Sequence, residues 1–142
     1  YRIGEYYYSS KKEGAQKTDE EYYAELENLV GNSKVEAVVV DPSAASFIEC
    51  IKRHGRFKVI RAKNDVVDGI HRVQEALREG RIFISPECRA TLREFSLYRW
   101  EENSVKDAPK KENDHAMDEI RYFVSTVLAK NDDGFFAIAS SR

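Results

Sequence analysis

The sequence is poor in the residues that define several common protein classes. Of its 142 residues only two are cysteines, Cys50 and Cys88, and neither stands in a CxxC motif or a Cys/His metal spacing. This pattern predicts two reduced, partly buried thiols in a cytosolic protein, rather than a disulfide or a zinc site. Seven glycines and three prolines are too few for a collagen-like or low-complexity chain.

Long hydrophobic runs and an excess of one charge are also missing. No apolar stretch approaches the roughly 20 residues of a membrane span, and the opening YRIGEYYYSS lacks the apolar core of a signal peptide. The 23 Lys and Arg are balanced by 25 Asp and Glu, so that the overall charge does not indicate a nucleic-acid partner. The motifs GxxxxGK[ST], GxGxxG, GxSxG and HExxH are absent, which excludes a self-contained P-loop ATPase.

Apolar residues make up 42% of the chain, enough for the core of one domain. We expect this domain over residues 1–129 and a tail over residues 130–142. Period-2 and period-3.6 patterns alternate along the chain, which predicts an α/β fold with helices on the faces of a sheet. Strands are expected at 1–9, 35–40, 57–62 and 81–85, and helices at 18–30, 44–54, 66–79, 87–98 and 114–129.

The segment 35–40, VEAVVV, is typical of a parallel strand buried on both faces. Asp41 follows it directly, and ligands of α/β proteins bind beyond the carboxyl ends of such strands. Asp41 is therefore a candidate site residue, although it could instead only cap the helix that begins after Pro42-Ser43.

A second candidate pair opens the last predicted helix. His115 and Asp118 are three residues apart and share a helix face, away from the apolar stripe. A carboxylate and an imidazole near a helix start can bind a divalent metal such as Mg²⁺ or Mn²⁺. The alternative is a polar first turn with an Asp that the helix dipole favours.

A third feature is the basic run at 51–63, which carries six Lys and Arg residues and no acid. It predicts an edge that follows a phosphate backbone, or else a solvated face. His54 lies in the same run and, like His71, has no partner pattern, so both are expected at the surface. The nucleic-acid candidates are Lys52, Arg53, Arg56, Lys58, Arg61 and Lys63.

Several of these segments, in this order, resemble the nuclease domain of tailed-bacteriophage (or prophage) terminase large subunits. They are VVVDPSAASFIECIKRHG, NDVVDGIHRVQEALREGRIFISPEC, EFSLYRW and KKENDHAMDEIRYFV. The resemblance covers about residues 5–128, and its most specific parts are the Asp-Pro-Ser after the buried strand and the DHxxDxxRY that opens the last helix.

The resemblance implies an RNase H-like mixed sheet flanked by helices, and an endonuclease that cuts concatemeric DNA during packaging. It implies that Asp41 and Asp118 are catalytic metal ligands, with His115 one turn earlier. Clustered carboxylates suit a two-metal site of Mg²⁺ or Mn²⁺, in which metals roughly 4 Å apart activate water and stabilise the leaving oxygen. The implied partners are double-stranded DNA, a terminase ATPase domain, the small terminase subunit and the portal, in the host cytoplasm and without a membrane.

The sequence departs from the family pattern at its start. The family's first catalytic Asp lies on a first strand within a G-x-D-x-G stretch, and no Asp here replaces it. The chain is therefore expected to lack the first two strands and one metal ligand, and to cleave weakly or not at all. Glu5 is expected to be an ordinary strand residue. The exposed edge beside the strand 35–40 needs a cover, either residues 1–9 or the GFFAIA of 134–139, from this chain or a second copy.

Two other functions stay open from the sequence. One is a non-catalytic module of the same fold that binds nucleic acid or a partner protein. The other is a resolvase-like or transposase-like nuclease. A further expectation is that residues 101–113, rich in Lys and polar side chains, form a mobile flap over the site.

Overall fold

The computed structural model describes the chain except for residues 9–12, 99–108, 110–113, 131–133, 135 and 141–142. The expected flap at 101–113 therefore lies outside the described residues, apart from Pro109.

A parallel sheet of three strands forms the centre of the described part of the chain. Its strands are β1 (Ala37–Val40), β2 (Val59–Arg61) and β3 (Phe136–Ala139), in the order β2-β1-β3. Val39 pairs with Ile60 on one side and with Ile138 on the other. The strands predicted at 35–40 and 57–62 are thus confirmed, each shorter than expected.

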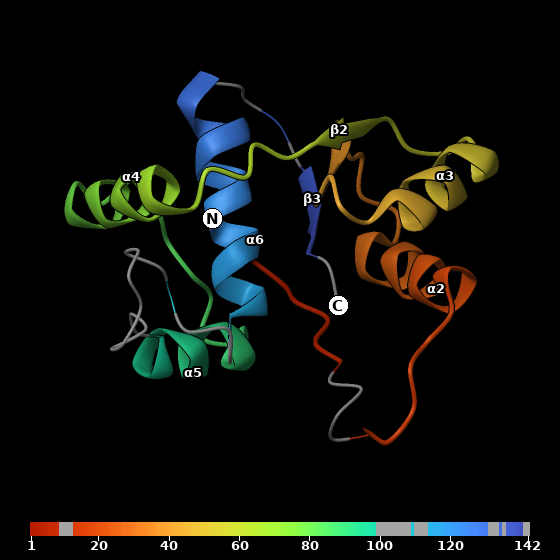
Figure 1. Ribbon diagram of the computed structural model, residues 1–142, viewed down its shortest axis with the longest axis horizontal. Coiled ribbons are helices and arrows are strands. Elements are labelled where there is room, and N and C mark those ends of the chain that lie inside the picture. The colour runs from red at the N-terminus through yellow and green to blue at the C-terminus, as the bar shows by residue number, and fades with distance from the viewer. Residues whose placement is uncertain (9–12, 99–108, 110–113, 131–133, 135, 141–142) are drawn as a thin grey trace.

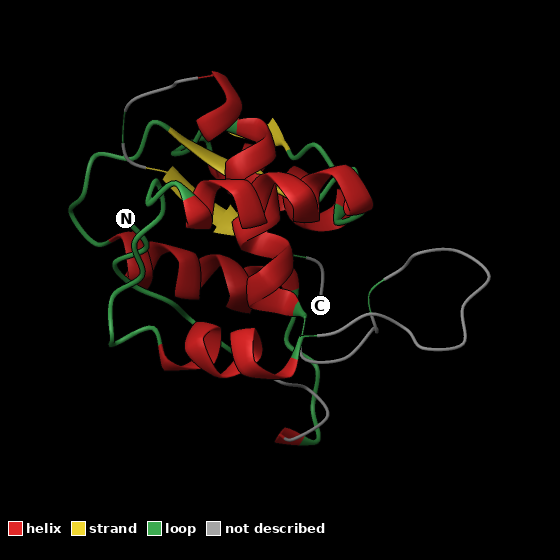
Figure 2. Ribbon diagram, turned by 90° about the vertical axis from the view of Figure 1, so that its left-hand side faces the viewer, coloured by secondary structure: helices red, strands yellow, loops and turns green. Residues whose placement is uncertain are grey.

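Helices cover both faces of this sheet (Figure 1). One face is covered by α2 (Asp19–Val30) and α3 (Ala45–His54), and the other by α6 (His115–Thr126), which a short 3₁₀ turn follows at Leu128–Lys130. Outside α6 lie α4 (Val66–Arg78) and α5 (Arg89–Leu97), so that seen from their side the helices hide most of the strands (Figure 2). This arrangement confirms the predicted α/β class.

The apolar run in β1 is explained by burial on both faces. Val38 and Val40 pack into the cluster under α2 and α3, which includes Leu26 and Ile48. Val39 points the other way, into the cluster with Tyr122 of α6. Successive strand residues face opposite sides, so a strand covered by helices on both sides has to be apolar throughout.

The ends of α2 and α6 are capped in different ways. Thr18 and Glu21 form a capping box at the start of α2, as the Thr18-Asp19-Glu20-Glu21 pattern predicts. Asp114 takes the N-cap position of α6, but its side chain makes no cap hydrogen bond. The Glu94 carboxylate of α5 accepts hydrogen bonds from the backbone N–H groups of Ala116 and Met117 instead, at 2.7 and 3.1 Å.

The strands predicted at 1–9 and 81–85 are wrong for the residues that the structure describes. The two segments meet in a single parallel bridge, Arg2 with Ile84, and neither joins the sheet. The N-terminal segment is held by its polar side chains, because Arg2 pairs with Glu119 of α6 and the Tyr7 hydroxyl donates to Glu94 of α5.

Glu5 is likewise not a strand residue. Its carboxylate accepts from the backbone N–H groups of Ala90 and Thr91 and from the Thr91 hydroxyl, at 2.6 to 3.1 Å. The first turn of α5 is therefore capped by a residue from the far end of the chain.

The strand β3 occupies the sheet edge that the sequence leaves open. It runs parallel to β1 over four residue pairs, and the Asp41 N–H continues the ladder to the Ala139 carbonyl at 3.0 Å. Of the covers considered for this edge, the GFFAIA segment of the same chain is confirmed, through residues 136–139. Among the described helices, none has both the length and the apolar character to cross a bilayer.

Glu94→Gln is predicted to destabilise the fold by about 2–3 kcal/mol. The Glu94 side chain is fully buried, and an amide would turn an N–H₂ group toward at least one of its three donors. Urea unfolding followed by circular dichroism measures the loss. The matched control is Glu87→Gln at an exposed glutamate, and equal stability of the two variants would contradict the capping role.

Candidate active site

Asp41 lies at the carboxyl end of β1 and is buried, since only 6% of its surface is exposed. One carboxylate oxygen, Oδ1, accepts from both the backbone N–H and the hydroxyl of Ser43, each at 2.8 Å. The other, Oδ2, accepts from the Tyr122 hydroxyl at 2.7 Å. These donors stabilise a charge that burial alone would make costly. Asp41 thus accepts hydrogen bonds from the turn that precedes α3, and it also accepts one from Tyr122 of α6.

Tyr122 connects Asp41 to the helix that carries Asp118. It lies in α6, four residues after Asp118, and is itself buried. Burial raises the pKa of Tyr122 above its ordinary value, and the hydrogen bond to Asp41 and the charges of Asp118 and Asp41 raise it further. Tyr122 therefore stays a protonated donor at neutral pH, within the electrostatic reach of both aspartates.

Asp118 lies in the first turn of α6 and is paired with Arg121 of the same helix. Its Oδ1 accepts from Nη2 of Arg121 at 3.0 Å, and 16% of its side chain is exposed. Burial, followed by the charge of Asp118, raises the pKa of Tyr98 to about 12. Asp118 is thus paired with one guanidinium, and its charge also acts on the phenols of Tyr98 and Tyr122.

His115 lies in the first turn of α6, three residues before Asp118, and is partly exposed. Its ring is 6.2 Å from that of Tyr7, centroid to centroid, in a tilted arrangement. The structure thus places Tyr122 in contact with Asp41 and one helical turn after Asp118, and leaves His115 one turn before Asp118 on the side of the N-terminal segment.

Arg121 holds Asp118 against the segment that precedes α4. Its guanidinium also donates to the Asn64 side chain at 2.8 Å and to the Asp65 carbonyl at 3.3 Å, both just before α4. Only 3% of the Arg121 side chain is exposed. Its stem lies so close to α4 that a Cβ atom built on Gly69 would be 2.6 Å from Cγ of Arg121.

The basic run divides into paired and unpaired residues. Lys52, Arg53 and Arg56 form ion pairs with Glu49, Glu20 and Glu27, at 3.3 to 3.5 Å. The acids come from α2 and α3, which is why the run itself shows no interleaved partner. Lys58, Arg61 and Lys63 are exposed and form no ion pair within the described part of the chain.

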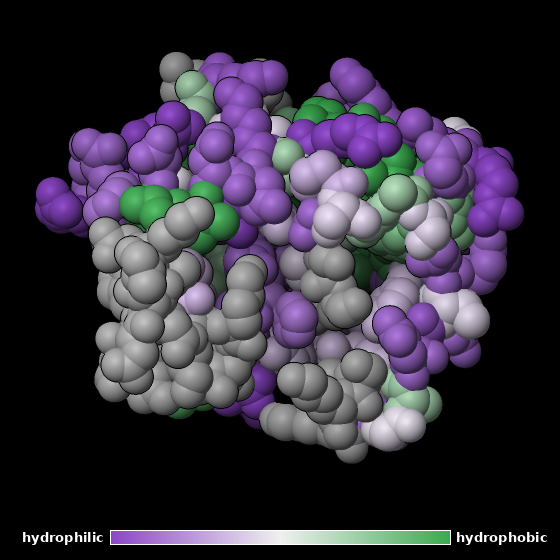
Figure 3. Space-filling model, in the orientation of Figure 1, coloured by the Kyte–Doolittle hydropathy of each residue, from purple (hydrophilic) through white to green (hydrophobic). Residues whose placement is uncertain are grey.

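Arg61 and Lys63 lie at the same end of the sheet as Asp41. Arg61 is paired in register with Val40, and the Ala62 N–H donates to the Val40 carbonyl at 2.9 Å. The Lys63 N–H donates to the Thr126 hydroxyl of α6, which fixes the chain here. Lys58 lies at the opposite end of β2, where its carbonyl accepts from Val38. Hydrophilic side chains dominate the face of the molecule in Figure 3.

The sequence predictions missed three residues of this site: Ser43 as a partner of Asp41, and Arg121 and Tyr122 as neighbours of Asp118. Arg121 and Tyr122 follow Asp118 by three and four residues, and this helical spacing was a usable signal. No sequence signal pointed to Glu94, which also contacts α6, because this contact joins residues more than twenty positions apart.

His54 and His71 are exposed, as predicted, and His54 also has a partner that the sequence pattern does not indicate. Its Nε2 lies 2.7 Å from Oε2 of Glu20, and its ring stacks on Tyr23 with centroids 3.8 Å apart. Both cysteines are free, as predicted, and both are fully rather than partly buried.

The chain is similar to large terminases of two bacteriophages. The large terminase of a thermophilic bacteriophage, solved with ADP, superposes with a TM-score of 0.83 and 46% identity over 87% of this chain. The structure of that terminase with ATP-γ-S gives the same values. The terminase large subunit of Escherichia phage T5 is 25% identical over 133 residues, or 89% of this chain. No family model matches the chain.

The chain is therefore similar to part of a terminase large subunit. This confirms the resemblance to terminase large subunits drawn from the sequence, and the fold is consistent with the RNase H-like class. The chain spans about a third of these relatives, 30% of the T5 protein and 32% of the thermophilic phage protein.

Gly69→Ala is predicted to displace Arg121 and so to release Asp118. The added methyl would overlap Cγ and Cδ of Arg121, at 2.6 and 2.8 Å, and we expect a loss of about 1–3 kcal/mol in stability. Without Arg121 the same change should cost nothing, because Ala favours a helix interior over Gly by about 1 kcal/mol. A double-mutant cycle with Arg121→Ala measures this, and an equal cost in both backgrounds would contradict the contact.

Proposed function

We propose that this chain is the metal-dependent endonuclease part of a DNA-packaging terminase. Asp41 and Asp118 bind Mg²⁺ or Mn²⁺ in this proposal, and His115 contributes from one turn earlier on α6. The single observation that supports it is the 2.7 Å hydrogen bond from the Tyr122 hydroxyl to Asp41. Tyr122 lies one helical turn after Asp118 on α6, so this bond links the helix of Asp118 to the end of the central strand.

The donor set fits a hard divalent cation. Carboxylate oxygens are the ligands that Mg²⁺ and Mn²⁺ prefer, and imidazole is better tolerated by Mn²⁺. A bound cation would supply Lewis-acid activation of the phosphodiester for attack by water, and in a two-metal site would also stabilise the leaving oxygen. Ser43 and Tyr122 orient Asp41 for this task, while Arg121 holds Asp118 in place.

Double-stranded DNA is the proposed substrate, and Arg61 and Lys63 are its first contacts. They are exposed, unpaired within the described residues and next in the sheet to the strand that ends at Asp41. The remaining cations of the predicted set, Lys52, Arg53, Arg56 and Lys58, extend this surface in the proposal. Lys52, Arg53 and Arg56 would first have to break an ion pair with a glutamate. We therefore expect them to contribute less to DNA binding.

The proposed ATPase partner lies outside these 142 residues. The relative from the thermophilic phage binds ADP and ATP-γ-S, whereas this sequence contains no GxxxxGK[ST] loop. The small terminase subunit and the portal stay predicted partners, and the host cytoplasm stays the predicted location.

The metal site is tested by titrating the chain with Mn²⁺ and measuring its thermal unfolding. A cation that binds only the folded state should stabilise it by about 2.7 kcal/mol at a hundredfold excess over Kd. We expect Asp118→Asn to abolish this shift, and Asp41→Asn to do the same. The stoichiometry of Mn²⁺ in an isothermal titration distinguishes one bound cation from two.

Two controls make this test specific. Glu75→Gln, at an exposed carboxylate on α4, should leave the Mn²⁺ shift unchanged. Cys50→Ser should leave it unchanged too, because Mn²⁺ prefers oxygen ligands to thiolate. A full shift in Asp118→Asn would refute the site and favour the non-catalytic module.

The DNA surface is tested by the salt dependence of duplex binding, followed by fluorescence anisotropy. Each lost phosphate contact should lower the slope of log K against log salt by about 0.9, so Arg61→Ala with Lys63→Ala should lower it by roughly 2. Lys52→Ala, which removes an ion-paired cation, is the matched control and should change the slope less. A slope untouched by the double substitution would rule out these two contacts.

A further inference from the structure

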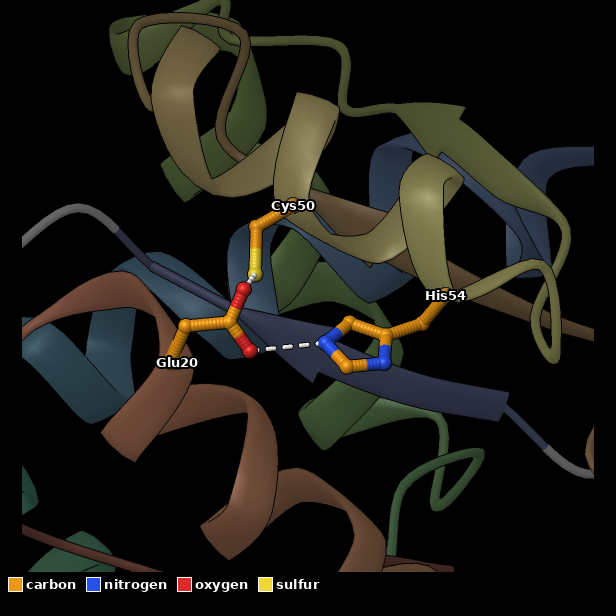
Figure 4. Close-up of side chains that lie close together, drawn as sticks. All are labelled: Glu20, Cys50 and His54. Atoms are coloured by element: carbon orange, nitrogen blue, oxygen red, sulfur yellow. Dashed lines mark hydrogen bonds and ion pairs between the residues drawn. The ribbon is translucent and has the colours of Figure 1, made fainter.

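A second group of potential metal ligands lies between α2 and α3. It comprises Glu20, the second residue of α2, and Cys50 and His54, which are one helical turn apart on α3. One ligand atom from each lies within 4.8 Å of the other two. Figure 4 shows the Glu20 carboxylate between the thiol and the imidazole, with one oxygen toward each.

The distances among these ligand atoms are close to those of a tetrahedral zinc site. Bond lengths to Zn²⁺ of about 2.3 Å for sulfur and 2.0–2.2 Å for nitrogen and oxygen give tetrahedral separations of about 3.6 Å for S···O and 3.4 Å for N···O. The chain has 3.4 Å between Cys50 Sγ and Glu20 Oε1, and 2.7 Å between His54 Nε2 and Glu20 Oε2. The two contacts use different oxygens of Glu20, so this carboxylate has to shift for one oxygen to bind a cation together with Cys50 and His54. Glu20 is an exposed side chain that can move.

The two ligands on α3 are held in place without a metal. The Cys50 side chain is fully buried, in the cluster that packs on β1. The His54 ring is fixed by its stack on Tyr23, with an interplanar angle of 7°, while 39% of the side chain remains exposed. A cation could therefore enter from solvent and find a sulfur and a nitrogen that need little rearrangement.

A cation that binds this group has to displace the Arg53 ion pair and the proton of the Cys50 thiol. Arg53 lies 3.5 Å from Glu20 Oε1 and would have to give up this exposed ion pair. Burial and the neighbouring Glu20 raise the pKa of the Cys50 thiol, so binding also releases its proton. These costs favour a cation with high affinity for thiolate and disfavour Mg²⁺ or Ca²⁺.

We propose that Glu20, Cys50 and His54 form a binding site for one thiophilic divalent cation, of which Zn²⁺ fits best. With three protein ligands the fourth position is left to water on the exposed side. The cation would join the start of α2 to the end of α3. The helix α3 starts four residues after Asp41, and Cys50 and His54 lie about 8 and 14 Å along it, at 1.5 Å per residue. This site does not depend on the proposed nuclease function.

The test uses Co²⁺ as a spectroscopic probe on the reduced chain. Coordination by Cys50 should produce a thiolate-to-cobalt charge-transfer band that saturates at one Co²⁺ per chain and disappears when Zn²⁺ is added. Zn²⁺ should also raise the melting temperature. Cys50→Ser should remove the band, and His54→Gln, at a partly exposed residue, should weaken cobalt affinity at least tenfold.

Matched controls use the other cysteine and an exposed histidine. Cys88→Ser and His71→Gln should keep the full band and the wild-type affinity, as should Asp118→Asn. Circular dichroism verifies that each variant is folded, and the exposed His54→Gln and Glu20→Gln keep the test valid if Cys50→Ser does not fold. The proposal is overturned by the absence of a thiolate band, by a band that survives Cys50→Ser, or by wild-type affinity in both His54→Gln and Glu20→Gln.

Discussion

The hydrogen bond between Tyr122 and Asp41 joins the last long helix to the central strand, and the geometry of the site depends on it. Both groups are buried, and the 2.7 Å bond crosses from α6 to the end of β1. A buried carboxylate without donors is unstable, so this bond and the two from Ser43 make a charged Asp41 tolerable within the core. The same bond fixes the rotation of α6, and with it the direction in which Asp118 points.

The other contacts of α6 complete this placement. Glu94 binds the first turn of the helix, Arg121 ties its middle to the segment before α4, and Arg2 pairs with Glu119. Glu94, Arg121 and Arg2 are largely buried, and hydrogen bonds or ion pairs offset part of the cost of burying them. The Nε atoms of Arg2 and Arg121 are buried without a hydrogen-bond partner within the described residues. The helix that carries Asp118 is thus held by polar contacts on several sides.

The two metal sites that we propose differ in chemistry in a way that follows from their positions. Asp41 and Asp118 offer oxygen at the carboxyl end of the sheet, where the unpaired cations Arg61 and Lys63 can receive a phosphate backbone. Glu20, Cys50 and His54 offer one oxygen, one sulfur and one nitrogen between two helices. Hard and soft cations would therefore select different ends of α3.

Local patterns were enough to predict much of the fold. The capping box at Thr18, the β-branched run of β1 and the apolar periodicity of the helices depend on neighbours in the chain, and all of these elements are present. The strands predicted at 1–9 and 81–85 failed because alternating side chains do not reveal whether a partner strand exists. The edge beside β1 is taken by β3 instead, which excludes residues 1–9 from it.

The sequence by itself determined that Asp41 follows a buried strand and that His115 and Asp118 share the start of a helix, because both depend on local spacing. Only the tertiary structure decided that Tyr122 bonds Asp41, that Glu94 caps α6, and that glutamates of α2 pair with Arg53 and Arg56 of the basic run. It also decided that Glu20 meets Cys50 and His54. These contacts join residues distant in the chain, and burial against a neighbouring element, rather than local propensity, selects them.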